Sequence, residues 1–406
     1  MNSFSLSPDG KRAVLSGRGD VFTVPEKNGV TRNLTRSSNA NDRNVDWSPD
    51  GKWISFISDK TGEDELYIQK QDGTDSATQL TKGGGSYKFY PVWSPNSKLI
   101  LLADRGQDLY YIDITTGAKT IITHSDNREF TDYTWAPDSK WIAYTEPGKA
   151  RRFDVIKLYN IESKKSIAVT DDWYNSGRSV FSSDGKLLYF VSERDFNPVY
   201  SNTEWNHAYI DMSKPYMVTL AAGTTSPFQL ENDEVAIKED SSDTGKTIAK
   251  KNKEKTQKKT ADKPYPTVEV KIDETGLTDR IESLPVAPGN YYNLTATNEG
   301  LYYVAASFRT PGHLKFFDLK DKKETETGDI NSYSISNNQK KIIFKKGDDF
   351  FIEDVSKIKI EAKNKLNLSG LKINTDLHAE WKQIFDESWR QMRDYFYDPN
   401  MHGVNW

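Results

Sequence analysis

Residues 47–56 read Trp47-Ser48-Pro49-Asp50-Gly51-Lys52-Trp53-Ile54-Ser55-Phe56: an aromatic residue, a polar turn and an apolar run. Proline sets φ at the second position of a turn, and Asp or Gly tolerates the backbone geometry that reverses a hairpin. Aromatic and β-branched residues, which flank the turn on both sides, are the residues that strands favour. The stretch therefore predicts two strands joined by a tight turn.

Copies of this phrase recur along the chain. They begin at positions 7, 48, 94, 136 and 182, which are 41, 46, 42 and 46 residues apart, and degraded copies begin at Thr297 and Ser336. A period of roughly 40 to 45 residues is that of a four-stranded propeller blade. We therefore predict an all-β fold for residues 1–369, a seven-bladed β-propeller of four-stranded blades, followed by a short α-helical segment.

The apolar strands lack polar alternation, which is typical of sheets buried on both faces, as in stacked blades. We expect the residue before each turn, such as Trp47, Trp93 or Trp135, to pack between blades rather than to stack on a ligand. Phe4–Leu6 is expected to be the innermost strand of blade one, and Lys365–Leu368 the last strand of blade seven. Neither terminus then completes the other's sheet, so packing alone would close the ring.

A polar segment, residues 231–263, interrupts the fifth repeat; it is acidic at first and then rich in lysine. It has too little apolar surface to fold alone, which predicts an exposed, disordered insertion that proteases cut first. A nucleic-acid-binding tail is the alternative interpretation. Strand pairing is expected to resume at Val268–Ile272.

Composition excludes several classes of function. The chain of 406 residues has a formal net charge of −4, which gives no electrostatic reason to expect nucleic acid or an anionic membrane as partner. It has no cysteine, so disulfides, thiolate catalysis and zinc–thiolate sites are absent. No apolar run approaches the roughly 20 residues that span a bilayer. The histidines are scattered and the common hydrolase and phosphate-binding motifs are missing, so we expect no metal and no cofactor.

After Gly370 the pattern changes to that of an amphipathic helix. Apolar residues such as Trp381, Phe385 and Trp389 recur every three or four positions. Asp376 is the expected N-cap and Pro399 the residue that ends the helix downstream. One helix is not a domain, so its apolar stripe must dock on the propeller or on further chain.

The last eighteen residues, Trp389–Trp406, resemble the opening of the catalytic core in tricorn proteases and tricorn-like serine peptidases. Residues 270–273, 279–281 and 284–286 resemble the propeller segment that precedes that core. The resemblance implies that residues 1–369 are the family's seven-bladed propeller and residues 370–406 the first helix of its first core domain. The family also has a six-bladed propeller, a PDZ-like domain and a second core domain.

By this resemblance, the propeller gates or filters peptides on their way to a serine peptidase core. The catalytic His and Ser would lie beyond Trp406, so we assign no catalytic residue and expect the chain alone to be inactive. The implied partners are peptides, the remaining core and PDZ-like domains, and further copies in a hexamer. The implied compartment is the cytoplasm, or the periplasm if a preceding region carried a signal peptide; the chain starts within a repeat, which suggests a fragment.

The candidate substrate-channel residues are arginines expected on turns after the second strands of successive blades. A cationic ring at one mouth of the channel could steer peptide carboxylates, whereas the alternative is ordinary solvated turn charge. These residues are Arg18, Arg105, Arg151, Arg152 and Arg194. His402 is the most tempting acid–base group, although a structural role is the stronger expectation.

Two other functions remain open from the sequence. One is a free-standing, TolB-like propeller that binds other proteins. The other is the propeller of a prolyl-oligopeptidase-like enzyme, whose hydrolase domain would be an α/β unit. The helix expected from Asp376 to Phe396 favours the tricorn-like interpretation, because it resembles that core and neither alternative.

Overall fold

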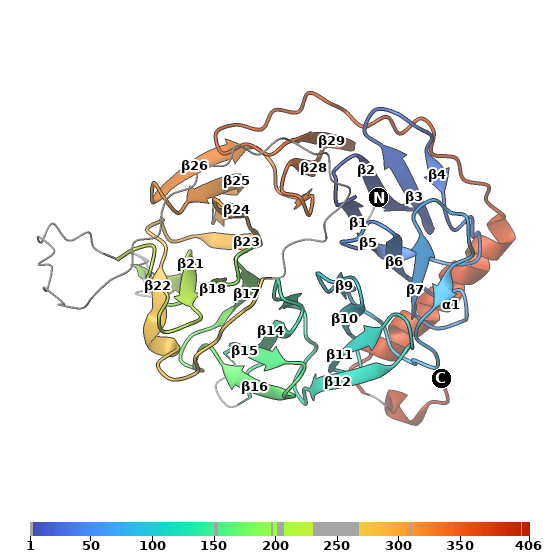
Figure 1. The fold of residues 1–406 in the computed structure, drawn as a ribbon. Helices are drawn as coiled ribbons and strands as arrows, with labels where there is room; N and C mark the ends of the chain where they lie inside the picture. The colour runs from blue at the N-terminus through green and yellow to red at the C-terminus, as the bar shows by residue number, and fades with distance from the viewer. Residues whose placement is uncertain are drawn as a thin grey trace, which may run out of the picture.

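The computed structural model describes residues 3–149, 153–195, 198–200, 207–229, 268–308, 310–398 and 400–406. Within these residues, seven antiparallel sheets surround a central axis (Figure 1). The predicted seven-bladed β-propeller with a short C-terminal helix is confirmed. In each blade the strands follow one another in chain order from the axis outward.

The first four blades have uninterrupted sequences. Blade one comprises β1 (Ser3–Leu6), β2 (Arg12–Gly17), β3 (Asp20–Pro25) and β4 (Arg32–Asn33). Blade two comprises β5 (Arg43–Trp47), β6 (Trp53–Ser58), β7 (Glu65–Lys70) and β8 (Thr78–Gln79). Blade three comprises β9 (Val92–Trp93), β10 (Leu99–Ala103), β11 (Asp108–Asp113) and β12 (Lys119–His124). Blade four comprises β13 (Tyr133–Trp135), β14 (Trp141–Glu146), β15 (Val155–Asn160) and β16 (Lys165–Ala168).

Blade five carries an extra hairpin between its second and third strands. It comprises β17 (Ser176–Phe181), β18 (Leu187–Ser192), β21 (Lys214–Thr219) and β22 (Ile281–Ser283), and the hairpin is β19 (Pro198–Tyr200) with β20 (His207–Tyr209). Blade six comprises β23 (Asn290–Ala296), β24 (Gly300–Ser307), β25 (Thr310–Asp318) and β26 (Lys323–Gly328). Blade seven comprises β27 (Tyr333–Ile335), β28 (Lys341–Lys346) and β29 (Asp349–Asp354).

The recurring turn is held by its own side chains. Ser48 Oγ donates to Asp50 Oδ1 at 2.7 Å and accepts from the Trp53 amide at 2.8 Å, while Asp50 Oδ1 also accepts from the Lys52 amide at 3.1 Å. Equivalent serines act in four other copies, at Ser7, Ser94, Ser182 and Ser336. The turn therefore repeats because one set of hydrogen bonds fixes each inner hairpin.

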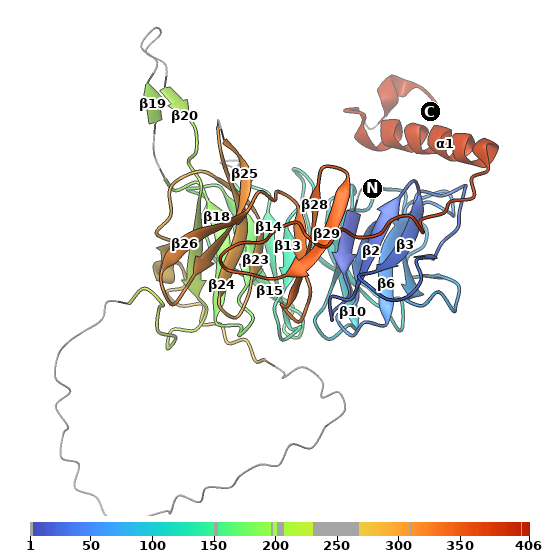
Figure 2. The same ribbon diagram turned by 90° about the horizontal axis from the view of Figure 1, so that it is seen from above.

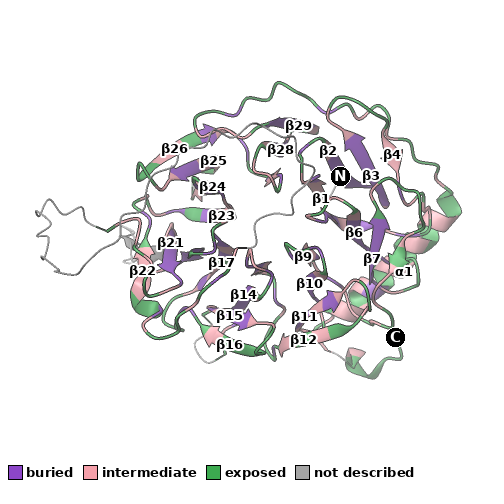
Figure 3. Cartoon of the chain, viewed as in Figure 1, coloured by how far each residue is buried: buried purple, intermediate pink, exposed green. Residues whose placement is uncertain are grey.

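The core lies between blades rather than within them. Trp47, Trp93 and Trp135 are 5–6 % exposed and pack in clusters between blades one and two, two and three, and three and four. Their predicted placement between blades is confirmed. Figure 3 shows that second strands such as β2 and β6 are mostly buried, whereas outermost strands such as β12 and β16 are more exposed.

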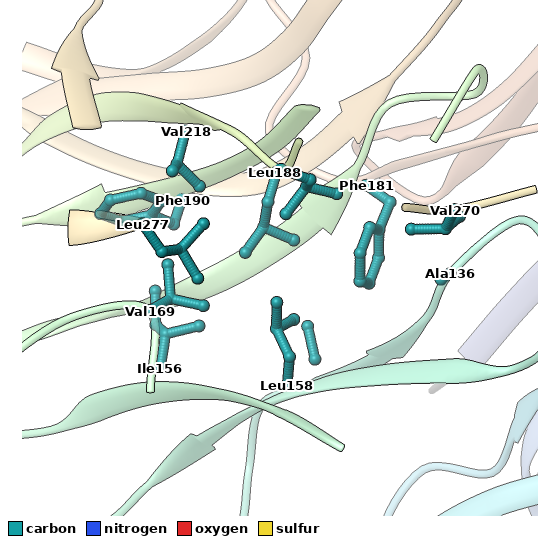
Figure 4. Packing of buried hydrophobic residues seen from close by; sticks show 12 residues of the cluster. Ala136, Ile156, Leu158, Val169, Phe181, Leu188, Phe190, Val218, Val270 and Leu277 are labelled. Carbon is teal, nitrogen blue, oxygen red and sulfur yellow. The ribbon is translucent and has the colours of Figure 1, made fainter. Parts of the chain in front are cut away.

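The segment after the insertion does not form the strand predicted at Val268–Ile272. The outer edge of β21 pairs instead with β22. Val270 is buried in the cluster between blades four and five, and its amide donates to Asp138 Oδ2 at 3.2 Å (Figure 4). Contacts with the neighbouring blade thus hold this segment, whereas the insertion predicted at residues 231–263 lies outside the described residues.

Ring closure combines packing with polar contacts. Leu15 and Phe22 of blade one pack on Ile343 and Phe350 of blade seven. The Asn338 amide donates to Pro8 O at 3.1 Å, and Lys341 Nζ lies 2.9 Å from Glu26 Oε1. The expectation of packing alone was therefore incomplete. The last strand predicted at Lys365–Leu368 is reduced to one bridge between Lys365 and Phe351, flanked by a bond from the Leu366 amide to Phe350 O.

The chain then runs along blade one to helix α1 (Leu377–Tyr395), which lies over one face of the propeller (Figure 2). Asp376 caps the helix as predicted, by accepting from the His378 and Ala379 amides. Pro399 lies outside the described residues, and α1 ends before it. Two 3-10 turns complete the elements, η1 (Thr278–Arg280) and η2 (Met401–Gly403). No helix in the described parts of the chain is long and apolar enough to cross a membrane.

Candidate functional site

One face of the propeller carries helix α1 and three of the predicted arginines. Arg18 lies between β2 and β3, Arg105 between β10 and β11, and Arg194 directly after β18, so each follows the second strand of its blade as expected. Arg151 and Arg152 lie outside the described residues.

Two of these arginines bind α1. Arg18 donates from Nε and Nη2 to the Glu380 carboxylate, at 2.8 and 2.9 Å. Arg105 pairs with Glu129 and donates from Nε to Asp394 O at 3.0 Å. Both contacts occupy the guanidinium groups with protein partners.

The third arginine lies elsewhere on this face. Arg194 is 5.4 and 5.7 Å from the ring centres of Tyr174 and Tyr216, and its Nε donates to Ser192 Oγ. The described contacts do not gather Arg18, Arg105 and Arg194 at one partner. Binding of peptide by these arginines stays a prediction.

Helix α1 docks through charged side chains. Arg390 binds the Asp59 carboxylate and donates from Nη1 to Gly62 O at 2.9 Å. Arg393 makes a two-pronged contact with Glu63, at 2.7 and 2.9 Å. These hydrogen bonds from Arg393 hold the pKa of Glu63 below its usual range. The interface is therefore built on paired ions.

A second layer of charges lies beneath this contact. Arg43 of β5 binds Asp64 through both carboxylate oxygens, one of them at 3.1 Å from Nη1. Lys88 Nζ donates to Asp64 O at 2.6 Å and lies 3.5 Å from Glu65. All four side chains are at most 8 % exposed. Buried ions require such pairing, because an unpaired charge in the interior is costly.

The apolar stripe of α1 faces away from the propeller. Trp381, Ile384 and Phe385 are 58, 52 and 70 % exposed, whereas Arg390 is the buried residue of the fully described helix. Trp406 stacks on Trp389 with ring centres 6.4 Å apart. The sequence predicted that the apolar stripe docks either on the propeller or on further chain. The structure shows that it does not dock on the propeller.

The residues that hold the helix were not predicted from the sequence. Glu380, Gln383, Glu387, Arg390 and Asp394 recur every three or four positions and form a polar stripe opposite the apolar one. That spacing was the available signal. Their partners on blades one to three have no such pattern, because they lie on separate turns.

The innermost strands of three blades carry β-bulges next to the axis. The register shifts in β5, β17 and β23, where Asn44, Arg178 and Asn293 have φ of 55°, 57° and 53°. Asp132 accepts from the Arg178 and Ser179 amides, and burial raises the pKa of Asp132. Bulges redirect side chains and often lie near functional sites.

His402 is part of a local turn. Its Nε2 contacts the Tyr397 hydroxyl, and its amide donates to Asp398 Oδ2 at 2.9 Å. These contacts agree with the expected structural role. Among the residues that the structure describes, no three His, Asp or Glu side chains are grouped to hold a metal ion.

Comparison with known proteins agrees with this architecture. Tricorn protease homolog 1 of Streptomyces coelicolor is 25 % identical over 99 % of this chain and 39 % of its own length. The putative tricorn-like protease C-terminal subunit of Sulfurisphaera tokodaii is 26 % identical over 95 % of this chain and 42 % of its own. The chain thus spans about two fifths of the length of these relatives.

Structural and domain matches cover both parts of the chain. A crystal structure of the tricorn protease has the same fold, with a TM-score of 0.77 and 19 % identity over 98 % of this chain and 38 % of that one. The tricorn protease C1 domain matches residues 377–406, and the tricorn protease second beta propeller domain matches residues 1–356. The match to the propeller domain covers most of the residues of this chain. The chain therefore belongs to the tricorn protease family.

Proposed function

We propose that this chain is the propeller portion of a tricorn-like serine peptidase and that it gates or filters peptides on their way to a catalytic core outside these 406 residues. Residues 1–369 then form the propeller domain, and residues 370–406 begin the core domain. The observation that carries the proposal is the position of α1. This helix matches the C1 domain and lies on one face of the propeller, outside every blade.

The exposed side of α1 supports a further folded unit on this helix. Large apolar side chains in a contiguous exposed patch mark an interaction site. Trp381, Phe385 and Trp389 form such a patch, and the C1 match is limited to α1 and the few residues after it. We assign the patch to the rest of the core domain. A free-standing binding propeller has no use for this helix.

The axis is the route that we assign to an extended peptide. The bulged strands β5, β17 and β23 are innermost strands that lie around this axis. Arg18, Arg105 and Arg194 lie on the face that carries α1, and Glu380 and Glu129 neutralise the first two. By family membership, the peptidase is proposed to act in the cytoplasm as a homo-oligomer, with a serine nucleophile contributed by the core.

The test is cleavage of a fluorogenic peptide library by the 406-residue chain and by the protein extended through its core domains. Activity in the extended protein alone supports the proposal, whereas activity in the 406-residue chain contradicts it. Gating is tested separately by cysteine labelling of an extended protein in which any cysteine of the core domains has been replaced, since these 406 residues contain none. A bulky maleimide on Ser334→Cys, in the innermost strand β27, should slow hydrolysis of long peptides in the extended protein. The same label on Lys165→Cys, in the outermost strand β16, should not.

A further inference from the structure

We propose that α1 is held on the propeller by an ionic latch that positions the peptidase core over blades one to three. The latch consists of five polar residues of the helix and their partners: Glu380 with Arg18, Gln383 and Arg390 with Asp59, Arg393 with Glu63, and Asp394 with Tyr87 and Arg105. The inference rests on the proposed function only in assigning α1 to a peptidase core.

The centre of the latch is the buried pair of Arg390 and Asp59. Asp59 is 4 % exposed, and its second oxygen accepts from the Asn41 amide at 2.6 Å. Gln383 Nε2 adds a bond to the same carboxylate at 2.9 Å. Without Arg390 the carboxylate would be buried without its counter-ion, which strongly favours release of the helix.

The two ends of the latch fix the direction of α1. Glu380 binds Arg18 near the start of the helix, and Arg393 binds Glu63 near its end, each through two parallel hydrogen bonds. Glu380 and Arg393 are separated by about 20 Å along the helix axis, at 1.5 Å per residue. Because paired bonds between guanidinium and carboxylate groups are directional, two of them resist both rotation and tilt of the helix.

The loop that binds α1 is itself anchored to the innermost strand of blade two. Arg43 in β5 binds Asp64, and its guanidinium lies 4.3 Å from the ring centre of Tyr87. The Tyr87 amide donates to Asp394 Oδ2 at 3.1 Å, and its ring meets the edge of Tyr395. The latch therefore ties the helix to a strand beside the axis through contiguous contacts.

Apolar packing contributes little to this docking, because the apolar stripe is exposed. Most of the stability of a helix in a protein comes from its tertiary contacts, so α1 should lose helical structure when it is undocked. Release of the latch should consequently be seen as loss of protection of the α1 amides from hydrogen exchange. Salt should act first at the exposed Arg18–Glu380 end, because screening affects exposed pairs more than buried ones.

The experiment is hydrogen–deuterium exchange of the 406-residue chain and of the extended protein. In Arg390→Gln, the α1 amides should exchange about a hundredfold faster or more, because a buried ion loses its partner. Arg393→Gln and Glu63→Gln are milder variants, each expected to accelerate exchange about two- to fivefold, as for partly exposed pairs. The double variant should exchange no faster than Arg393→Gln, because that change already removes the Glu63 contact together with the bond from Arg393 Nη2 to Gly85 O.

The matched control is Lys382→Gln with Asp386→Asn. This pair, at 2.6 Å, lies on the same helix but has no partner on the propeller among the described contacts. It should change α1 exchange by about twofold at most. Unchanged exchange of α1 in Arg390→Gln overturns the proposal. Equal acceleration in β6 and β7 also overturns it, because Arg390 would then stabilise blade two. Absence of peptidase activity in the extended protein bears on the proposed function alone.

Discussion

Two tryptophans at equivalent repeat positions differ in one hydrogen bond. Trp135 Nε1 donates to Val92 O at 3.1 Å, whereas Trp93 Nε1 is buried with no acceptor among the described residues. The two side chains are 6 % and 5 % exposed. Phenylalanine at either position removes the same atoms, so the packing losses largely cancel in a comparison.

Trp135→Phe should therefore be the more destabilising change. It loses a hydrogen bond worth about 0.5–1.5 kcal/mol, while Trp93→Phe removes an unpaired donor whose burial costs about 1–3 kcal/mol. The free energies of unfolding should differ by about 1.5–4.5 kcal/mol on these values. Trp47→Phe is the control, because Trp47 Nε1 also donates, to Gly51 O at 3.2 Å, and should resemble Trp135→Phe.

The assay is urea unfolding followed by far-UV circular dichroism, with midpoints compared at a common slope. Tryptophan fluorescence is avoided because the variants remove the reporter. If Trp93→Phe costs as much as Trp135→Phe, the indole hydrogen bond does not distinguish these positions. Packing volume alone would then account for the aromatic repeat.

Three further changes test the turn, a buried acid and the helix cap. Ser48→Ala should lower the free energy of unfolding in urea by about 1–3 kcal/mol, because the Trp53 amide loses its acceptor. Ala136 stands where Ser48 stands in its own repeat, so Ala136→Ser should raise the free energy of unfolding. A lower free energy of unfolding in Ala136→Ser would contradict the turn mechanism. Burial raises the pKa values of Asp42 and Asp46 to about 6 each, so between pH 4 and 6 the folded state holds protons that the unfolded chain has released. Stability should therefore fall as pH rises, with about 3 kcal/mol of the fall contributed by Asp42. Asp42→Asn should remove the contribution of Asp42, and an unchanged pH profile would refute the assignment. Asp376→Ala should weaken α1 by about 1 kcal/mol, measured as faster exchange in its first turn, with the blades unaffected.

The fold could be predicted because its determinants are local and periodic. The serine–aspartate turn uses residues within five positions of one another, and the flanking apolar strands repeat with the blade. The strand predicted at Val268–Ile272 was wrong for the opposite reason. Its apolar alternation fits a strand, yet the partner edge was taken by β22, a competition decided by tertiary contacts.

The candidate site was only partly accessible from the sequence. Arg18 and Arg105 could be placed on the correct turns by counting strands, but their partners on α1 are 362 and 289 residues away. Ion pairs between residues so far apart in the sequence leave no periodic pattern in it. The burial of Asp59 leaves none either. The polar stripe of α1 does, and it was overlooked because apolar residues are the usual guide to a buried helix face.

In α1 the polar face is buried against the propeller and the apolar face is exposed, which is the reverse of the usual pattern. The energetics of the two faces explain this arrangement. Exposed ion pairs contribute about 0–1 kcal/mol each, so the pairs at its ends supply direction more than adhesion. The buried Arg390–Asp59 pair offsets the cost of removing two charges from water, and its main effect is to penalise any other position of the helix. The apolar area of α1 lies on the side away from the propeller, so it adds little adhesion between the helix and the blades. Charges thus determine where the helix lies on blades one to three, and the apolar face determines how strongly the unit built on it is held together.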